Sequence, residues 1–357
     1  MLVIDAKITG IVYTPLLCKS LTRYDADSFE SALNKETAFL LDIRQNTVAI
    51  STWVSAKRTR SYPYARVYNT LRHSGKKITV IPFVKDEGKD GDRDFIQWDT
   101  ISLMSLLDVY VIVAYYAQAE ASTRYANKIT RQQFDPAFVR GELERLLSYQ
   151  SSALHWNIDQ IGKIANIAQA AKLSYVAISR DTGIPLHSPE GIDKRIALLM
   201  KSKTAFMSLS RDSAKSAQRR ETMTIQPKEQ VTNGTKAQIN ITNYLGGIYY
   251  LTSDETRIKG NTVFIIEGKH TKQGKLPSDD DIKDGLLKMF LFANLKEVQI
   301  DGKPYTPVSI LKLTAEHNGT PSAADLNSRQ QRLIAALTEE AKINRFELEF
   351  PWSHTRE

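Results

Sequence analysis

The stretch 237–313 constrains the fold more than any other feature, because it alternates β-forming runs with a single helix-length run. Three runs rich in β-formers, QINIT, IYYLTSD and TVFIIEGKH, are separated by the turn sequences NYLGG and RIKGN. Next comes LPSDDDIKDGLLKMFLFANL, in which Ser278 or Asp279 can cap a helix with an acidic first turn. The strands EVQI and PVSILKL follow. We therefore expect the order β-β-β-α-β-β, a meander with a covering helix and return strands.

At 357 residues the chain exceeds the usual size of one domain, so we expect either two packed domains or one core with a large elaboration. Strand-like runs are expected at 37–41, 47–54, 77–84 and 109–116, with a short helix at 99–107. The pair Asp135-Pro136 marks a boundary to amphipathic helices, expected at 137–172 and 192–200. The predicted class is α/β, with an N-terminal α/β region (1–135), a helical region (136–225) and a C-terminal core (226–357).

The charge balance indicates a polyanionic partner. The chain carries 48 Lys and Arg against 40 Asp and Glu, a net charge of +8, which favours nucleic acid but also fits an enzyme with a small anionic substrate. The single cysteine, Cys18, cannot form an internal disulfide or a cysteine-based zinc cluster. The start of the chain lacks signal-peptide features, and the longest apolar run, 106–117, is too short to span a bilayer. A cytoplasmic protein without membrane contact is expected.

Two acids and a lysine in the expected meander form a candidate site. Side chains alternate along a strand, so Glu267 and Lys269 share a face at the end of an apolar run. Asp254 ends the preceding strand. A hairpin loop through residues 255–261 would set Asp254 opposite Thr262, so the two acids meet only if that strand bends or shifts register.

Paired carboxylates repel one another unless a hard divalent cation such as Mg²⁺ neutralises them. A nearby lysine can stabilise phosphorane charge or help to deprotonate a water that the metal has acidified. In the alternative without catalysis, Glu267 and Lys269 form a salt bridge at the end of the sheet and Asp254 initiates a turn.

In these residues the sequence resembles the PD-(D/E)xK nucleases, and most closely their type II restriction endonucleases. The matching residues are Asp254 and then Glu267-Gly268-Lys269, with Ser253 where a proline commonly stands before the aspartate. The resemblance covers residues 237–313. It implies a restriction-endonuclease-like core with a mixed central sheet flanked by helices, Asp254 and Glu267 as ligands of Mg²⁺, and Lys269 as an aid to the attacking water.

A second Glu-Gly-Lys string, at 87–89, follows the apolar run ITVIPFV but lies in the polar sequence KDEGKDGDRD. We interpret it as a loop that would not fix a catalytic geometry. Whether an upstream acid such as Glu190 or Glu229 joins the metal site stays open. The six histidines show no metal-ligand spacing, and no Walker or dinucleotide glycine motif is present.

Two basic segments are candidates for DNA contact. Residues 55–77 contain no acid, which argues against local charge pairing, and 201–220 is basic and serine-rich. The alternatives are a solvated loop with half-buried tyrosines and a solvated helix or arm. The candidate DNA-binding residues are Lys57, Arg58, Arg60, Tyr62, Tyr64, Arg66, Arg219 and Arg220.

Together these features predict a Mg²⁺-dependent, sequence-specific endonuclease acting on double-stranded DNA, as a homodimer if its sites are symmetric. The alternatives are a structure-specific repair or recombination nuclease and a non-catalytic DNA-binding protein. Only the nucleases need the acid pair.

Overall fold

The structure, a computed structural model, describes residues 2–58, 61–201, 215, 235–272, 274–316, 326–350 and 352. The chain forms two compact units: Met1–Lys19 with Ser213–Glu357, and Ser20–Asp212. We call them the split unit and the continuous unit. They do not follow the three consecutive segments expected from the sequence, because the first residues of the chain lie with the C-terminal ones and the helices after Asp135 lie with residues 20–135.

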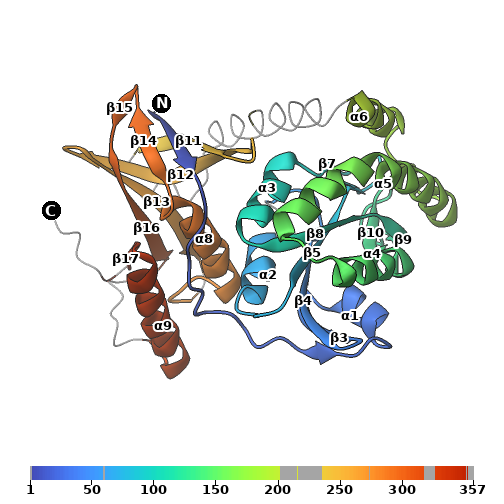
Figure 1. Cartoon of the computed structure of the whole chain (residues 1–357), viewed down its shortest axis with the longest axis horizontal. Coiled ribbons are helices and arrows are strands. Elements are labelled where there is room, and N and C mark those ends of the chain that lie inside the picture. Colours follow the sequence, from blue (N-terminus) through green and yellow to red (C-terminus); the bar gives the residue numbers. More distant parts are fainter. Residues whose placement is uncertain are drawn as a thin grey trace. The chain divides into compact units, whose positions relative to one another are not determined.

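The split unit contains an eight-stranded mixed sheet, flanked by helices, in the order β15-β14-β1-β11-β12-β13-β16-β17 (Figure 1). Its strands are β1 (Leu2–Ile8), β11 (Thr235–Asn243), β12 (Ile248–Lys259), β13 (Thr262–Thr271), β14 (Lys296–Ile300), β15 (Lys303–Pro304), β16 (Thr306–Ala315) and β17 (Glu347–Glu349). The pairs β1–β11, β13–β16 and β16–β17 are parallel, and the other pairs are antiparallel. The expected meander, helix and return strands are therefore confirmed.

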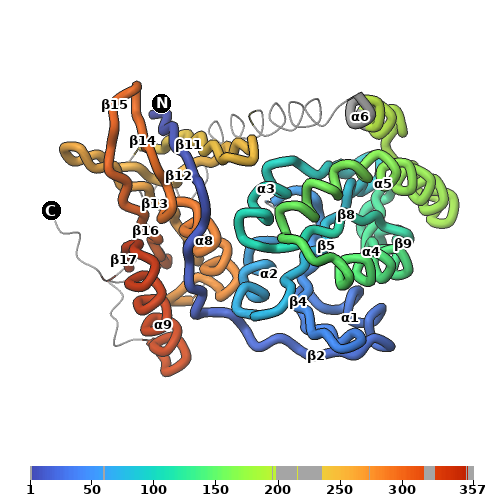
Figure 2. The backbone as a smooth tube through the Cα atoms, in the orientation of Figure 1, coloured from blue at the N-terminus to red at the C-terminus, as the bar shows by residue number. Residues whose placement is uncertain are grey.

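Strand β1 was not anticipated from the sequence. Figure 2 shows the N-terminal segment running beside β11 and β14, and its residues pair with β11 from Leu2↔Ala237 to Ile8↔Asn243. Ile4, Ala6 and Ile8 are buried while the residues between them are exposed. This alternation is that of a strand with one face in the core.

Helix α8 (Asp279–Phe292) connects β13 to the later strands and packs on β13 and β16. The Ser278 hydroxyl accepts a hydrogen bond from the Asp281 N–H, so the expected N-cap is confirmed. Helix α9 (Ser328–Asn344) precedes β17 and begins with a capping box between Asn327 and Gln330. None of the described helices is long and apolar enough to cross a membrane.

The continuous unit contains a five-stranded sheet in the order β2-β3-β4-β5-β8, with small sheets β9–β10 and β6–β7. The strands are β2 (Arg23–Tyr24), β3 (Ala38–Ile43), β4 (Asn46–Thr52), β5 (Lys77–Pro82), β6 (Val84–Asp86), β7 (Arg93–Phe95), β8 (Val109–Ala114), β9 (Tyr116–Ala121) and β10 (Ile129–Phe134). Because β4, β5 and β8 are mutually parallel, the segments that follow them leave the sheet at one edge. The runs expected at 77–84 and 109–116 are each divided between two strands.

The helices of this unit are α1 (Phe29–Lys35), α2 (Pro63–Thr70), α3 (Trp98–Leu106), α4 (Pro136–Ser148), α5 (Ala153–Thr182) and α6 (Glu190–Lys201). The Asp135 carboxylate accepts a hydrogen bond from the Phe138 N–H, and Pro136 occupies the first turn of α4, which confirms the expected helix start. Helix α5 ends at Gly183, whose φ of +70° suits a glycine cap.

Candidate active site

The β12–β13 hairpin has a different register from the one expected. Strand β12 continues to Lys259, which pairs with Thr262 across the two-residue turn Gly260-Asn261. The pairs run from Lys259↔Thr262 to Glu255↔Ile266, so Asp254 follows directly beyond the last pair. The expectation that Asp254 lies opposite Thr262 was wrong, because the residues taken for a loop extend the strand.

A β-bulge sets the direction of Asp254. Thr256 pairs with Thr235 and Ser253 with Ala237, so Asp254 and Glu255 together oppose the single residue between the two partners. The Asp254 Oδ2 accepts a hydrogen bond of 2.8 Å from the Gly268 N–H. A Cβ on Gly268 would lie 3.4 Å from the same oxygen. The Asp254 carboxylate is therefore held at the backbone of Gly268, the residue between Glu267 and Lys269.

Glu267 is buried between two ammonium groups. It is 1% exposed, its Oε1 lies 3.0 Å from the Lys269 Nζ, and its Oε2 accepts a hydrogen bond of 2.9 Å from the Lys288 Nζ. Burial opposes ionisation, but the charges and hydrogen bonds of the two lysines outweigh it and lower the pKa of Glu267 to about 2. Glu267 is therefore a carboxylate at neutral pH.

Lys269 is bound by two acids and covered by α8. Its Nζ donates a 2.9 Å hydrogen bond to the Asp284 Oδ2 in addition to its contact with Glu267. Burial disfavours the ammonium form, but Glu267 and Asp284 outweigh burial and raise the pKa of Lys269. Its side chain lies close to Gly285, where an added Cβ would stand 3.1 Å from the Lys269 Cε. We call Glu267, Lys269, Asp284 and Lys288 the Glu267 cluster.

Of this cluster, only Glu267 and Lys269 were expected from the sequence. Asp284 and Lys288 lie four residues apart on α8, a spacing that places two side chains on the same helix face. Because the helix covers the strand of Glu267 and Lys269, this spacing indicates that both charged side chains can face that strand.

A second ionic network lies on the opposite face of the same strands. The Glu255 Oε1 accepts a hydrogen bond of 2.6 Å from Arg257, and its Oε2 accepts one of 2.8 Å from Lys312. Arg257 also donates two hydrogen bonds to Glu349. Glu255 pairs in register with Ile266, and Lys312 with Gly268, so this network does not share the face of Glu267. It offers a matched control, because it too contains a buried glutamate bound to lysine.

The side chains of Asp254 and Glu267 offer carboxylate oxygens, the type of ligand that Mg²⁺ prefers. The Asp254 carboxylate binds the Gly268 N–H, whereas each carboxylate oxygen of the preceding residue, Glu267, lies against a lysine ammonium group. Within the described residues no group of three or more His, Cys, Asp or Glu side chains could hold a metal ion. One or two carboxylates suffice for Mg²⁺ when waters and substrate phosphates complete its shell. Asp254 can supply one oxygen to a cation shared with a phosphate ligand, whereas a cation at Glu267 would have to displace Lys269 or Lys288 from its oxygens.

Two basic residues of the segment 55–77 form ion pairs with acids from later in the chain. Arg58 lies 3.6 Å from Asp99, and Lys57 lies 3.9 Å from Asp94. Burial raises the pKa of Asp99, against the opposing charge of Arg58. The argument from the absence of local acids was wrong, because acids distant in sequence supply the pairing.

The remaining candidate residues divide into three groups. Arg66 donates to the Thr52 carbonyl at 2.7 Å, and Tyr64 is buried. Tyr62 is exposed and precedes α2 with a φ of +51°. Arg60, Arg219, Arg220 and Glu229 lie outside the described residues, while Glu190 begins α6 in the continuous unit.

Comparisons with protein-family models, curated proteins and solved structures find no match to this chain.

Proposed function

We propose that this chain is a Mg²⁺-dependent endonuclease that cuts double-stranded DNA at specific sequences. The observation that carries the proposal is the buried contact between Glu267 and Lys269, 3.0 Å apart at the end of β13, with Asp254 bound to the intervening residue, Gly268. A buried carboxylate and a buried ammonium are costly to maintain, and a hydrophobic pair would stabilise a sheet end as well or better. Such a pair therefore adds little net stability, which is compatible with a role in chemistry.

The arrangement of strands supports the same proposal. The meander β11-β12-β13 is followed by α8 and by β16, which runs parallel to β13. This is the order implied by the resemblance to the PD-(D/E)xK nucleases. The Glu-Gly-Lys string falls on the third strand of the meander, and Asp254 falls on the second.

Each residue has a role in the proposed reaction. Asp254 and Glu267 would hold the cation, which when bound supplies charge stabilisation and acidifies a water. Lys269, held as an ammonium by its two acids, donates a charge-assisted hydrogen bond to the scissile phosphate. Lys288 keeps Glu267 ionised. The excess of positive charge on the chain favours DNA as the substrate, and a homodimer would match a symmetric site.

Digestion of a sequenced plasmid by the purified protein tests the proposal. With Mg²⁺ we expect discrete fragments, and with EDTA none. Asp254→Ala and Glu267→Ala should each abolish cutting while retaining DNA binding in a gel shift, because neither removes a cationic contact to phosphate. Glu255→Gln, on the opposite face of the sheet, is the matched control and should still cut if its melting temperature shows that it folds.

Other outcomes assign the chain differently. Smeared products would favour a nuclease that reads DNA structure rather than sequence. Specific binding without cutting in any divalent cation would favour a non-catalytic DNA-binding protein. Cutting by both alanine variants at rates near wild type would remove Asp254 and Glu267 from the reaction.

A further inference from the structure

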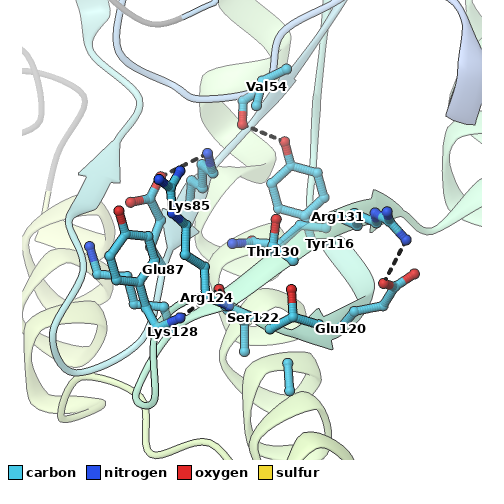
Figure 3. Close-up of a pocket in the computed structure, with 15 residues that line it drawn as sticks. Val54, Lys85, Glu87, Tyr116, Glu120, Ser122, Arg124, Lys128, Thr130 and Arg131 are labelled. Atoms are coloured by element: carbon cyan, nitrogen blue, oxygen red, sulfur yellow. Dashed lines mark hydrogen bonds and ion pairs between the residues drawn. The ribbon is translucent and has the colours of Figure 1, made fainter.

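A pocket in the continuous unit lies at the edge where parallel strands end. It has a volume of about 680 Å³, and Val54, Lys85 and Tyr116 line it from the segments that follow β4, β5 and β8 (Figure 3). In open α/β sheets, ligands bind outside the carboxyl ends of the strands. The volume falls within the roughly 300–1,000 Å³ typical of ligand pockets.

The outer wall of the pocket is the β9–β10 hairpin, whose connecting residues carry two cations around one tyrosine. Arg124 lies over the ring of Tyr125 at 5.9 Å from its centroid, and Lys128 lies over it at 5.0 Å. The Ser122 hydroxyl accepts hydrogen bonds of 3.2 Å from the N–H groups of both Arg124 and Tyr125. The Tyr125 ring thus contacts both cations, and Ser122 orders the backbone that carries Arg124 and Tyr125.

The lining has a surplus of positive charge. Four cationic side chains and two carboxylates line the pocket. Lys85 pairs with Glu87 at 2.9 Å, and Arg131 pairs with Glu120 at 3.0 Å, on opposite sides of the pocket in Figure 3. In the part of the chain that the structure describes, no carboxylate pairs with Arg124 or Lys128. These two side chains account for the surplus.

We propose that this pocket binds one strand of a nucleic acid through its phosphate groups, with Arg124 and Lys128 as the principal contacts. Cations that are held in place but not neutralised suit phosphate oxygens, and the hydroxyls of Thr123 and Thr130 also line the pocket and can donate to them. The volume exceeds the needs of a single inorganic ion. The inference shares with the proposed function the premise that nucleic acid is the partner, but it assigns binding to a unit that does not contain the Glu267 cluster.

Binding of a fluorescein-labelled thymidine oligonucleotide, followed by anisotropy in EDTA across a range of salt concentrations, tests the proposal on the full chain. The variant Arg124→Gln/Lys128→Gln should raise Kd at least ~10-fold at low salt. The slope of log K against log salt should become shallower by about 0.7 for each lost contact. The matched control, Lys163→Gln/Arg180→Gln, removes another lysine held over an aromatic ring and an exposed arginine of the same unit. It should change Kd by less than about twofold.

Three results would overturn the proposal. The first is an unchanged Kd in the pocket variant with its melting temperature preserved. The second is an equal loss in the control variant, which would mean a general charge effect. The third is displacement of the oligonucleotide by thymidine monophosphate or inorganic phosphate at concentrations near that of the oligonucleotide itself, which would mean a site for a free phosphate ester. These binding measurements do not report cutting. If they contradict the pocket proposal, the nuclease proposal is unaffected. If the chain binds through the pocket but does not cut DNA, only the nuclease proposal is contradicted.

Discussion

Lys269 shows how two neighbouring acids determine what a buried amine can do. Alone at this depth, a lysine would tend to lose its proton, but Glu267 and Asp284 raise its pKa above the ordinary value. A lysine kept protonated cannot accept a proton from water near neutral pH. In the proposed reaction it therefore acts as a fixed positive charge and hydrogen-bond donor, and not as a general base.

Substitution of Lys269 tests this assignment. Lys269→Ala should lower the single-turnover cleavage rate by at least ~10²-fold, the range for loss of one electrostatic group. DNA affinity measured in Ca²⁺ should change far less. Lys269→Arg keeps the charge and should retain part of the rate. Lys312→Ala, on the opposite face, is the control. An arginine variant that folds and binds but is as inactive as the alanine variant would indicate proton transfer or a strict geometric requirement instead.

The low pKa of Glu267 predicts how stability depends on pH. The folded-state pKa of about 2 lies below the ordinary value of 4.5, so this carboxylate contributes stability that is fully present above pH 4.5 and is lost as pH falls toward 2. The contribution is on the order of 3 kcal/mol. Glu267→Gln should therefore lower the free energy of unfolding at pH 7 but progressively less below pH 4.5.

Urea titrations at several pH values measure this difference. Glu297→Gln removes an exposed partner of Lys7 and serves as the control, with no change expected. A gap between wild type and Glu267→Gln that stays constant from pH 7 to pH 2 would contradict the assignment.

At the scale of elements, α8 lies unusually close to the sheet beside Lys269. A Cβ added to Gly285 would stand 2.8 Å from the Leu311 Cδ1 and 3.1 Å from the Lys269 Cε. Both neighbours are held by their surroundings, since Leu311 is fully buried and Lys269 is bound by two acids. The glycine thus allows α8 to pack directly on Lys269.

Gly285→Ala should displace these side chains. The usual gain from alanine in a helix, up to about 1 kcal/mol, should be lost to crowding of about 1–3 kcal/mol. Gly162→Ala in α5, where nothing lies within 4 Å of the added Cβ, should show the gain alone. Thermal unfolding gives the stabilities, and cleavage should fall only in the Gly285 variant. Equal stability changes in the two variants would show that α8 has room to move.

The helix and strands of this region could be predicted from local sequence because their signals are local. Ser278 and the acids after it predicted the cap of α8, and the alternation in TVFIIEGKH placed Glu267 and Lys269 on one face. The relation of Asp254 to Glu267 could not be predicted, because it depends on a bulge between β12 and β11 and on the length of the turn. Likewise, the ion pair between Arg58 and Asp99 could not be predicted, because the two residues lie far apart in the sequence.

For the molecule as a whole, the split unit depends on strand β1. Ile4 is fully buried and lies opposite Ile239. Ile4→Asp would bury an unpaired charge at the centre of the sheet and should cost more than about 3 kcal/mol. Lys7→Gln, at an exposed position of the same strand, should have little effect. Hydrogen exchange in β11 and β14 measures the loss of pairing. Native protection of both strands in the aspartate variant would contradict a central role for β1.

The position of β1 also has a consequence for synthesis. The Asn240 side chain hydrogen-bonds to Asp5, 235 residues earlier in the chain. A ribosome adding about 5–20 residues per second needs tens of seconds to make that interval. During that time β1 has no β11 to pair with, while all of the residues 20–212 are made and can fold. The sheet that carries the Glu267 cluster can thus be completed only late in translation, so the proposed nuclease activity should be absent from a nascent chain until almost all of it has been made.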